Sequence, residues 1–317
     1  MQPIIEISNL TISFHGDEYC LTAIEDLTLS IFKGETLAII GESGSGKSVL
    51  GQAILSILPE SAEIQGIINY REKNLLMASD SELESIRGGL IGWVPQNPKM
   101  GFNPSMKMWK QIAESMIIHT DSSWSEAKRQ AISLLERFKV LPADQWADAY
   151  PVSYSGGMLQ RAMVAMGTSV NPDVIIADEP TKGVDLLNKS GITDLFLEMK
   201  TRGITQILIT HDLDFARELA DRVAVLYCGQ IVEITSKEIF FTHPRHPYSH
   251  GLLQSLPQNG LCPIPGNAPP MHIVHTGCRF KDRCSDSKKE CKNPVPFFSM
   301  NKDYVRCFNY HNRDQPL

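Results

Sequence analysis

The chain has 317 residues, of which 42% are hydrophobic and 21% charged, and its formal net charge is -6. This length can bury a sizeable core, in one large domain with an extension or in two modest domains. The mild negative charge argues against a broad basic face for nucleic acid, so we expect no nucleic-acid partner. No apolar run approaches the roughly 20 residues that span a bilayer, and the first residues lack a signal-peptide pattern. We therefore expect a cytosolic protein.

The apolar residues follow two patterns along the chain. Roughly the first 35 residues alternate weakly between apolar and polar, which favours half-buried antiparallel strands. Short apolar runs with β-branched residues follow, and such runs predict strands of a mainly parallel sheet covered by helices. These runs are LAII (37–40), LIGWV (90–94), VIIA (174–177), ILIT (207–210) and VAVLY (223–227).

Helical signals dominate the stretch 97–170, which we interpret as a helical subdomain inserted between strands of the sheet. Within it, SSWSEAKRQAISLLERF begins with a capping box formed by Ser123 and Glu126. After about residue 240, periodicity fades and Pro, His, Cys and Asn become frequent. We therefore predict an α/β domain over residues 1–240 and a loop-rich extension over 241–317.

The segment GESGSGKS matches the phosphate-loop pattern G-x-x-x-x-G-K-[ST] in full. It lies between a predicted strand and a predicted helix, where backbone N–H groups and the helix N-terminus can surround phosphates. We expect Lys47 to contact the β- and γ-phosphates of ATP and Ser48 to ligate Mg²⁺. The predicted nucleotide-binding residues of this loop are Gly41, Glu42, Ser43, Gly44, Ser45, Gly46, Lys47 and Ser48.

A second segment, DVIIADEP, predicts a buried strand that ends in two carboxylates. Asp178 suits a contact to Mg²⁺, either direct or through water. Glu179 suits a general base that polarises the attacking water. Taken alone, the segment could equally be an ordinary strand end with solvated acids, and the phosphate loop upstream favours the catalytic interpretation.

The segment YSGGMLQR opens a predicted helix with Ser155, Gly156 and Gly157, and a helix N-terminus suits an anion. Its position between the phosphate loop and Asp178 resembles the nucleotide-binding subunit of an ABC transporter. In that family the Ser-Gly-Gly of one subunit contacts the γ-phosphate held by the phosphate loop of the other. Tyr154 stands where the family usually has leucine.

The resemblance implies roles for three further residues. Gln96, in WVPQNP, resembles the glutamine that senses Mg²⁺ and the attacking water and leads to the membrane subunits. His211, in LITHDLD, resembles the switch histidine at the γ-phosphate. Asp185, in TKGVD, resembles the aspartate of the D-loop, although Lys182 and Gly183 depart from the usual residues before it.

Adenine recognition and the domain layout are also implied by the resemblance. Phe14 is the expected aromatic partner of adenine and Tyr19 its rival, although either could simply belong to the core. The implied fold is α/β: a RecA-like parallel-sheet core, an N-terminal antiparallel β subdomain, an inserted helical subdomain and the cysteine-containing extension.

The segments NPKMGFNPSMKMWKQI and FTHPRHPYSHGLL resemble the oligopeptide, dipeptide and nickel importer branch of the family. The implied partners are a homologous second ATP-binding subunit, two transmembrane permease subunits and, indirectly, an extracytoplasmic solute-binding protein. The implied location is peripheral, on the cytoplasmic face of the membrane.

Peptide, nickel, a metal chelate or another small solute remain open as cargo. A non-transport ATPase acting on ribosomes or DNA, and an inactive regulatory cassette, are the alternatives.

Four cysteines lie close together near the end of the chain: Cys278, Cys284, Cys291 and Cys307. Clustered cysteines in a cytosolic protein favour metal binding over disulfides. Several members of the importer branch carry a 4Fe-4S cluster in this extension, and the resemblance implies the same here. Zinc and ordinary packing are the alternatives. We expect Cys262 not to be a ligand, and Cys20 and Cys228 to be small buried residues.

Overall fold

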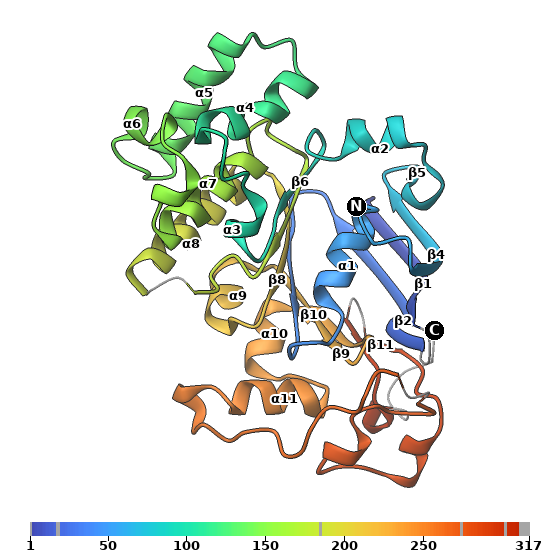
Figure 1. Ribbon diagram of the computed structural model, residues 1–317. Coiled ribbons are helices and arrows are strands. Elements are labelled where there is room, and N and C mark those ends of the chain that lie inside the picture. Colours follow the sequence, from blue (N-terminus) through green and yellow to red (C-terminus); the bar gives the residue numbers. More distant parts are fainter. Residues whose placement is uncertain (1, 17–19, 184–185, 273–274, 301–302, 311–317) are drawn as a thin grey trace. The chain divides into compact units, whose positions relative to one another are not determined.

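The computed structural model describes residues 2–16, 20–183, 186–272, 275–300 and 303–310 (Figure 1). The chain divides into two compact units. The first contains Met1–Phe32, Leu37–Leu76 and Ile209–Leu317, and the second contains Lys33–Thr36 and Met77–Leu208. No helix in the described ranges is both long and apolar enough to cross a membrane.

The first unit begins with an antiparallel sheet. β1 (Pro3–His15) pairs with β2 (Cys20–Phe32) on one side and with β4 (Ala62–Tyr70) on the other. β5 (Lys73–Asn74) completes the order β2-β1-β4-β5. The side chains of β1 tend to alternate between buried and more exposed positions, as expected for strands with one face on the core. The predicted N-terminal antiparallel subdomain is confirmed.

A second sheet of the first unit carries the phosphate loop. Its strands run in the order β11-β12-β10-β9-β3, and β3 pairs in parallel with β9. The extension contributes two of these strands, so it continues a sheet that the α/β domain begins. The strands are β3 (Thr36–Ile40), β9 (Arg222–Tyr227), β10 (Gln230–Ser236), β11 (Phe298–Met300) and β12 (Asp303–Val305).

The helices of the first unit are α1 (Lys47–Ile54), α9 (Leu213–Leu219), α10 (Lys237–Thr242) and α11 (Pro247–Gln254). The extension packs on the sheet through an aromatic cluster of Tyr227, Phe240, Tyr248 and Phe280, all at most 3% exposed. The ring centroids of Tyr227 and Tyr248 lie 4.5 Å apart. Because this apolar core is shared, the extension is not held by its cysteine segment alone.

The second unit contains the strand order β8-β7-β6, with β6 parallel to β7. The strands are β6 (Ile91–Val94), β7 (Val174–Asp178) and β8 (Thr205–Thr210). Every residue of β7 and β8 is buried, which is the pattern expected of parallel strands covered on both faces. The five strands predicted from the apolar runs are therefore all present.

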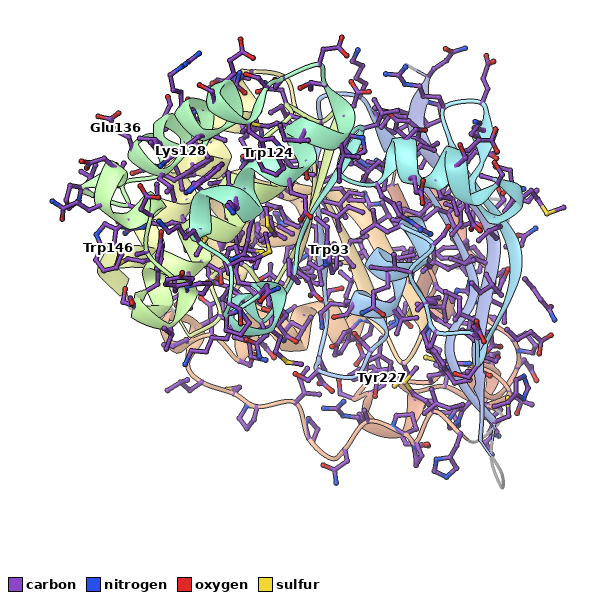
Figure 2. All side chains as sticks on the ribbon, turned by 45° about the horizontal axis from the view of Figure 1, so that its top comes forward. Trp93, Trp124, Lys128, Glu136, Trp146 and Tyr227 are labelled. Atoms are coloured by element: carbon purple, nitrogen blue, oxygen red, sulfur yellow. The ribbon has the colours of Figure 1, made fainter. Side chains whose placement is uncertain are left out.

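Helices make up most of the rest of the second unit. The predicted capping box at the start of α5 is confirmed, because Ser123 and Glu126 each accept a backbone N–H of the other. Trp124 and Lys128 follow along this helix (Figure 2), and both approach Trp109 of α4. The helices are α2 (Asp80–Ile86), α3 (Pro98–Gly101), α4 (Met108–His119), α5 (Trp124–Arg137), α6 (Ala143–Ala147), α7 (Gly156–Gly167) and α8 (Leu186–Thr201).

Candidate nucleotide-binding site

The phosphate loop turns sharply between β3 and α1. Gly46, the N-cap of α1, has φ 102°, and a Cβ there would collide with the carbonyl oxygen of Ala23. Gly44 also lies in the left-handed region, with φ 80°. Only glycine adopts such angles without strain, so the two glycines let the backbone close around a phosphate-sized space.

Lys47 begins α1 and turns back over the loop. Its side chain is buried, and its Nζ donates to the carbonyl oxygens of Gly41 at 2.8 Å and Glu42 at 2.9 Å. These bonds hold the ammonium group at the loop. The Ser45 hydroxyl is buried and makes no hydrogen bond within the described residues, so it is a polar group suited to an incoming phosphate oxygen. Ser48 lies in the first turn of the same helix.

Two other predicted residues belong to the first unit. Phe14 lies in β1, half-buried, opposite Leu21 of β2. His211 directly follows β8 and is exposed, and the next residue, Asp212, caps α9 by accepting the N–H of Phe215. The structure thus places His211 at the start of a fixed turn after a buried strand, as predicted.

In the second unit, β7 ends in the two predicted carboxylates. Asp178 is 3% exposed and Glu179 is 6% exposed. Glu179 has φ 50°, a left-handed conformation that is uncommon for residues other than glycine and is concentrated at functional sites. In the strand register, Ala177 pairs with Val94 of β6. The segment that bears Gln96 therefore leaves the sheet at the same edge as Asp178.

The Ser-Gly-Gly segment forms the start of α7. Ser155 is its N-cap, and its hydroxyl accepts the N–H of Met158 at 3.3 Å. Ser155 and Gly156 are exposed, so this helix N-terminus is open to solvent in the chain by itself. Tyr154 instead points inward: it is 7% exposed, and its hydroxyl donates to the carbonyl oxygen of Trp146 at 2.6 Å. Burial raises the pKa of Tyr154.

Two residues predicted for nucleotide contacts lie outside the described ranges, namely Tyr19 and Asp185. The residues before Asp185 are described: Lys182 and Gly183 are exposed, and Gly183 has φ 71°.

The sequence did not indicate what surrounds the phosphate loop on its outer side. Two residues of the extension contact Glu42: Tyr248 accepts its backbone N–H, and Arg283 pairs with its carboxylate. Both lie more than 200 residues from the loop along the chain. Glu42 was predicted from the loop pattern, but no sequence pattern pointed to its partners.

The four clustered cysteines line one small cavity in the extension, together with His246 and Phe280: they are Cys278, Cys284, Cys291 and Cys307. Burial raises the pKa of Cys278 to about 11, and the charges of Cys291 and Cys284 act in the same direction. The backbone also joins two of these cysteines, because Cys278 donates its N–H to the carbonyl oxygen of Cys291 at 2.9 Å.

The cavity does not amount to a formed metal centre. Within the described ranges, no group of three or more histidine, cysteine or acidic side chains is arranged to hold a metal ion. The donor set fits a four-thiolate group in number, because all four thiols line the same cavity. Two other cysteines were predicted to be buried. Cys228 is buried as expected, whereas Cys20 is exposed, so the prediction for Cys20 is wrong.

A phosphate loop after one buried strand, together with another buried strand that ends in Asp-Glu, defines a nucleoside-triphosphatase of the phosphate-loop class. Comparison with known proteins narrows the class. The ABC transporter family profile matches residues 24–182, and the profile of the oligopeptide/dipeptide transporter C-terminal region matches residues 232–291. The chain belongs to the ABC transporter family and is one of its ATP-binding subunits, an ATPase coupled to transport that uses ATP and Mg²⁺.

Curated relatives cover almost the whole chain. The dipeptide transport ATP-binding protein DppD of Bacillus subtilis is 36% identical over 96% of this chain and 93% of its own length. The oligopeptide transport ATP-binding protein OppD of the same organism is 38% identical over 97% and 89%. The OppD protein of Haemophilus influenzae is 34% identical over 96% and 97%.

Solved structures confirm the predicted fold class. A dimeric ATP-binding cassette in a post-hydrolysis state with ADP and phosphate is 26% identical, with a TM-score of 0.67. The similarity covers 74% of this chain and 98% of that one. The cbiO1 protein of Clostridium perfringens, part of the ABC transporter complex cbiONQ, has a TM-score of 0.64 and the same identity over 77% and 93%.

Proposed function

We propose that the chain is the ATP-hydrolysing subunit of an importer for peptides. The observation that carries this proposal is the match of residues 232–291 to the oligopeptide/dipeptide transporter C-terminal region, beyond the general ATPase match. Three relatives named for dipeptide or oligopeptide transport align over nearly the full length. An ATPase of ribosomes or DNA has no reason to carry this extension, so transport is favoured over that alternative.

The roles proposed for the nucleotide-binding residues follow the family pattern. The loop from Gly41 to Ser48 surrounds the phosphates, with Lys47 at the β- and γ-phosphates and Ser48 and Asp178 at Mg²⁺. Glu179 polarises the attacking water. The buried position of Asp178 and Glu179 and the left-handed backbone at Glu179 support these roles.

Four further residues complete the proposed site. Gln96 senses Mg²⁺ and the water, and His211 contacts the γ-phosphate. Phe14 stacks on adenine, and Asp185 links the two ATP sites of a dimer. The position of His211 after a buried strand, and of Gln96 after the strand that neighbours β7, support the first two roles.

The partners follow from the family. Two ATP-binding subunits enclose ATP between the phosphate loop of one and Ser155, Gly156 and Gly157 of the other, and the dimeric state of a solved cassette supports a dimer. The second subunit is proposed to be a homologous but different chain. Two permease subunits form the membrane pathway, a solute-binding protein delivers cargo from outside, and this chain acts at the cytoplasmic face of the membrane.

The function is tested by transport. The full chain, expressed with its neighbouring transporter genes, should co-purify with membrane subunits, and the assembly in proteoliposomes should take up peptide only with ATP inside. Lys47→Ala should abolish uptake while the assembly still forms, because the substitution removes the cation at the phosphates. Co-sedimentation with ribosomes and no association with membrane subunits would contradict the proposal.

The cysteine cavity is proposed to hold a 4Fe-4S cluster. Four thiols facing one cavity match the number of ligands of that cluster. The bound group would supply structural stability to a segment poor in periodic apolar residues, and ATP-driven transport requires no electrons from it.

Metal analysis tests this part separately. Protein purified anaerobically should be brown and contain about four irons per chain. Cys284→Ser should lose the iron, whereas Cys262→Ser should retain it, because Cys262 lies outside the cavity. One zinc per chain with no iron would establish the zinc alternative, and iron-free, zinc-free protein from iron-replete cells would leave the cysteines as packing residues.

A further inference from the structure

The phosphate loop contains a single acidic side chain, and a residue of the C-terminal extension neutralises it. The guanidinium of Arg283 meets the carboxylate of Glu42 as a fork: Nη1 lies 3.0 Å from Oε2 and Nη2 lies 3.1 Å from Oε1. The Arg283 side chain is 7% exposed and that of Glu42 is 32% exposed. Paired N–H···O bonds in such a partly desolvated place are among the stronger polar contacts in proteins.

Arg283 is itself fixed on several sides. Its Nε donates to the carbonyl oxygen of Pro265 at 2.8 Å, and its Nη1 also donates to the Tyr227 hydroxyl at 3.2 Å. The guanidinium carbon lies 5.8 Å from the ring centroid of Phe280. The side chain therefore has little freedom, and the position of Glu42 is determined by the extension.

The backbone of the loop is held by the extension as well. The N–H of Glu42 donates to the hydroxyl of Tyr248 at 2.8 Å. Tyr248 is fully buried, and its ring packs against Tyr227 and Phe280. Glu42 is thus fixed through its backbone and its side chain at once, by two residues that the general ATPase pattern does not include.

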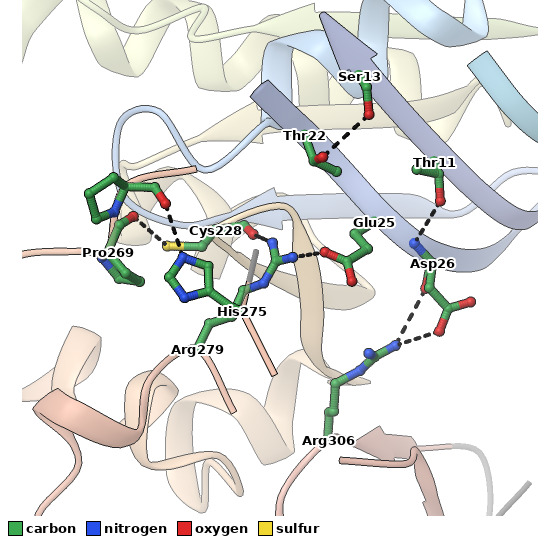
Figure 3. Close-up of polar contacts among 11 residues, drawn as sticks. Thr11, Ser13, Thr22, Glu25, Asp26, Cys228, Pro269, His275, Arg279 and Arg306 are labelled. Carbon is green, nitrogen blue, oxygen red and sulfur yellow. Dashed lines mark hydrogen bonds and ion pairs between the residues drawn. The ribbon is translucent and has the colours of Figure 1, made fainter. Parts of the chain in front are cut away.

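A second arginine of the same segment holds the turn at Cys228, which in turn contacts the loop (Figure 3). Arg279 donates to the carbonyl oxygen of Cys228 and pairs with Glu25. The next residue of that turn, Gly229, donates its N–H to the carbonyl oxygen of Ser45 at 2.9 Å. Arg279 follows Cys278 directly, and Arg283 precedes Cys284 directly, so one short segment contacts the loop at Glu42 and also holds the turn that bonds to Ser45.

We propose that Arg283 is a positioning residue for ATP binding: it cancels the charge of Glu42 and fixes the loop in the conformation that accepts phosphates. This inference rests on the proposed role of the loop from Gly41 to Ser48. An ATP tail carries several negative charges, so an unpaired carboxylate within the loop would repel it, and at short range such repulsion is costly. The extension is therefore part of the nucleotide site of its own chain.

Binding of a fluorescent ATP analogue to the full-length chain tests the proposal. Arg283→Met, which keeps most of the side-chain volume, should weaken binding roughly tenfold, the size expected for one charged pair. Arg283→Lys should fall between Arg283→Met and the native chain, because it restores the charge without the fork. Adding Glu42→Gln to Arg283→Met should recover most of the affinity, because the amide carries no charge to repel phosphate.

The matched control is Arg306→Met. Arg306 is another buried arginine of the extension, and its side chain contacts Asp26 (Figure 3) and the ring of Phe297, with no described contact to the phosphate loop. Its substitution should change the affinity for the ATP analogue by no more than about twofold, even if it lowers the unfolding temperature. The unfolding temperature of each variant is measured without nucleotide and set beside its affinity for the ATP analogue. A loss of affinity without a matching loss of stability indicates that the residue positions the loop.

Each outcome bears on the proposal. Native affinity in Arg283→Met, with binding lost in Lys47→Ala, would overturn the role of Arg283 and leave the loop assignment intact. Native affinity in Lys47→Ala as well would overturn the loop assignment itself. Equal losses in Arg283→Met and Arg306→Met, or no recovery by Glu42→Gln, would reduce Arg283 to a structural residue. If Arg283→Met does not fold, Glu42→Gln alone decides: it should bind the analogue at least as tightly as the native chain, because no carboxylate charge is left to repel phosphate, and weaker binding contradicts the proposal.

Discussion

Tyr154 differs from the leucine usual in the family, and its own packing accommodates the difference. Leucine is usual before the Ser-Gly-Gly, and tyrosine adds a hydroxyl that must find a partner when buried. That partner is the carbonyl oxygen of Trp146, and the two rings meet edge to face at 5.0 Å. The departure therefore concerns packing behind α7, and the helix N-terminus remains free to meet a phosphate.

Tyr154→Phe should destabilise the chain by about 1 kcal/mol, because it deletes one buried hydrogen bond and leaves a carbonyl oxygen without that donor. Its ATPase activity in the assembled transporter should stay near that of the native protein. Tyr150→Phe is the control, because the Tyr150 side chain is 44% exposed. Urea unfolding of the three proteins measures the difference, and equal midpoints for Tyr154→Phe and Tyr150→Phe would contradict the packing role.

Glu179→Gln should lower the rate of ATP hydrolysis about 100-fold or more, the usual contribution of a general base, while leaving ATP affinity within about twofold. The amide keeps the shape of the side chain but cannot accept a proton from water. The assembled transporter should be assayed with the catalytic glutamate of the partner also replaced, so that only this site is measured. Near-native turnover under those conditions would remove Glu179 from the catalytic role.

At the residue scale, the sequence could predict those site residues that lie close to one another along the chain. The loop residues and the Asp-Glu pair lie in short contiguous patterns whose chemistry requires that order, so both could be located directly. The partners of Glu42 are separated from it by 206 and 241 residues, and only the folded aromatic cluster brings them together. The exposure of Cys20 was missed for a related reason, because Cys20 is the first residue of β2 and the sequence does not show where that strand begins.

At the scale of elements, long or strongly patterned segments were predictable. The five buried strands and the cap of α5 follow from apolar runs and from one local side-chain pattern. β11 and β12 were not predicted, because each has three residues: β12 forms by adding to β10, and β11 forms by adding to β12. Periodicity cannot reveal a strand that depends on an edge supplied by a distant part of the chain.

The turn between β9 and β10 is the element on which the loop rests, and Gly229→Ala should disturb it. Gly229 has φ 81°, and a Cβ there would lie 2.8 Å from the carbonyl oxygen of Ala23. Gly203→Ala is the control, because Gly203 has a similar φ of 76° but nothing within 4 Å of its Cβ. Both variants carry backbone strain of about 1 kcal/mol or more, and only Gly229→Ala adds a collision with backbone.

Gly229→Ala should therefore unfold at a lower urea concentration than Gly203→Ala, and it alone should weaken binding of the ATP analogue. The second effect is expected because the N–H of Gly229 bonds to Ser45 of the loop. Identical unfolding and identical affinity in the two variants would show that the turn accommodates the methyl group, and that the loop does not depend on it.

At the scale of the whole molecule, the proposed dimer would have this chain contribute half of each of two ATP sites. Ser155 and Gly156 are exposed at the start of α7, and an unobstructed helix N-terminus favours an anion. Ser155→Arg places a long cationic side chain at this opening. In the proposed dimer it should block the site whose phosphate loop belongs to the partner, while the site built on Lys47 of the same chain binds ATP normally.

Nucleotide trapping in a heterodimer that carries the single Ser155→Arg substitution distinguishes the two sites. Retention of ATP at Lys47, with loss at the partner's loop, is the expected result, because the substituted side chain lies in the site formed across the dimer. Ser153→Arg is the control: Ser153 is also exposed, but it lies before the cap of α7. Loss of ATP at Lys47 alone would mean that α7 faces the nucleotide of its own chain, and the dimer would then have to be assembled differently.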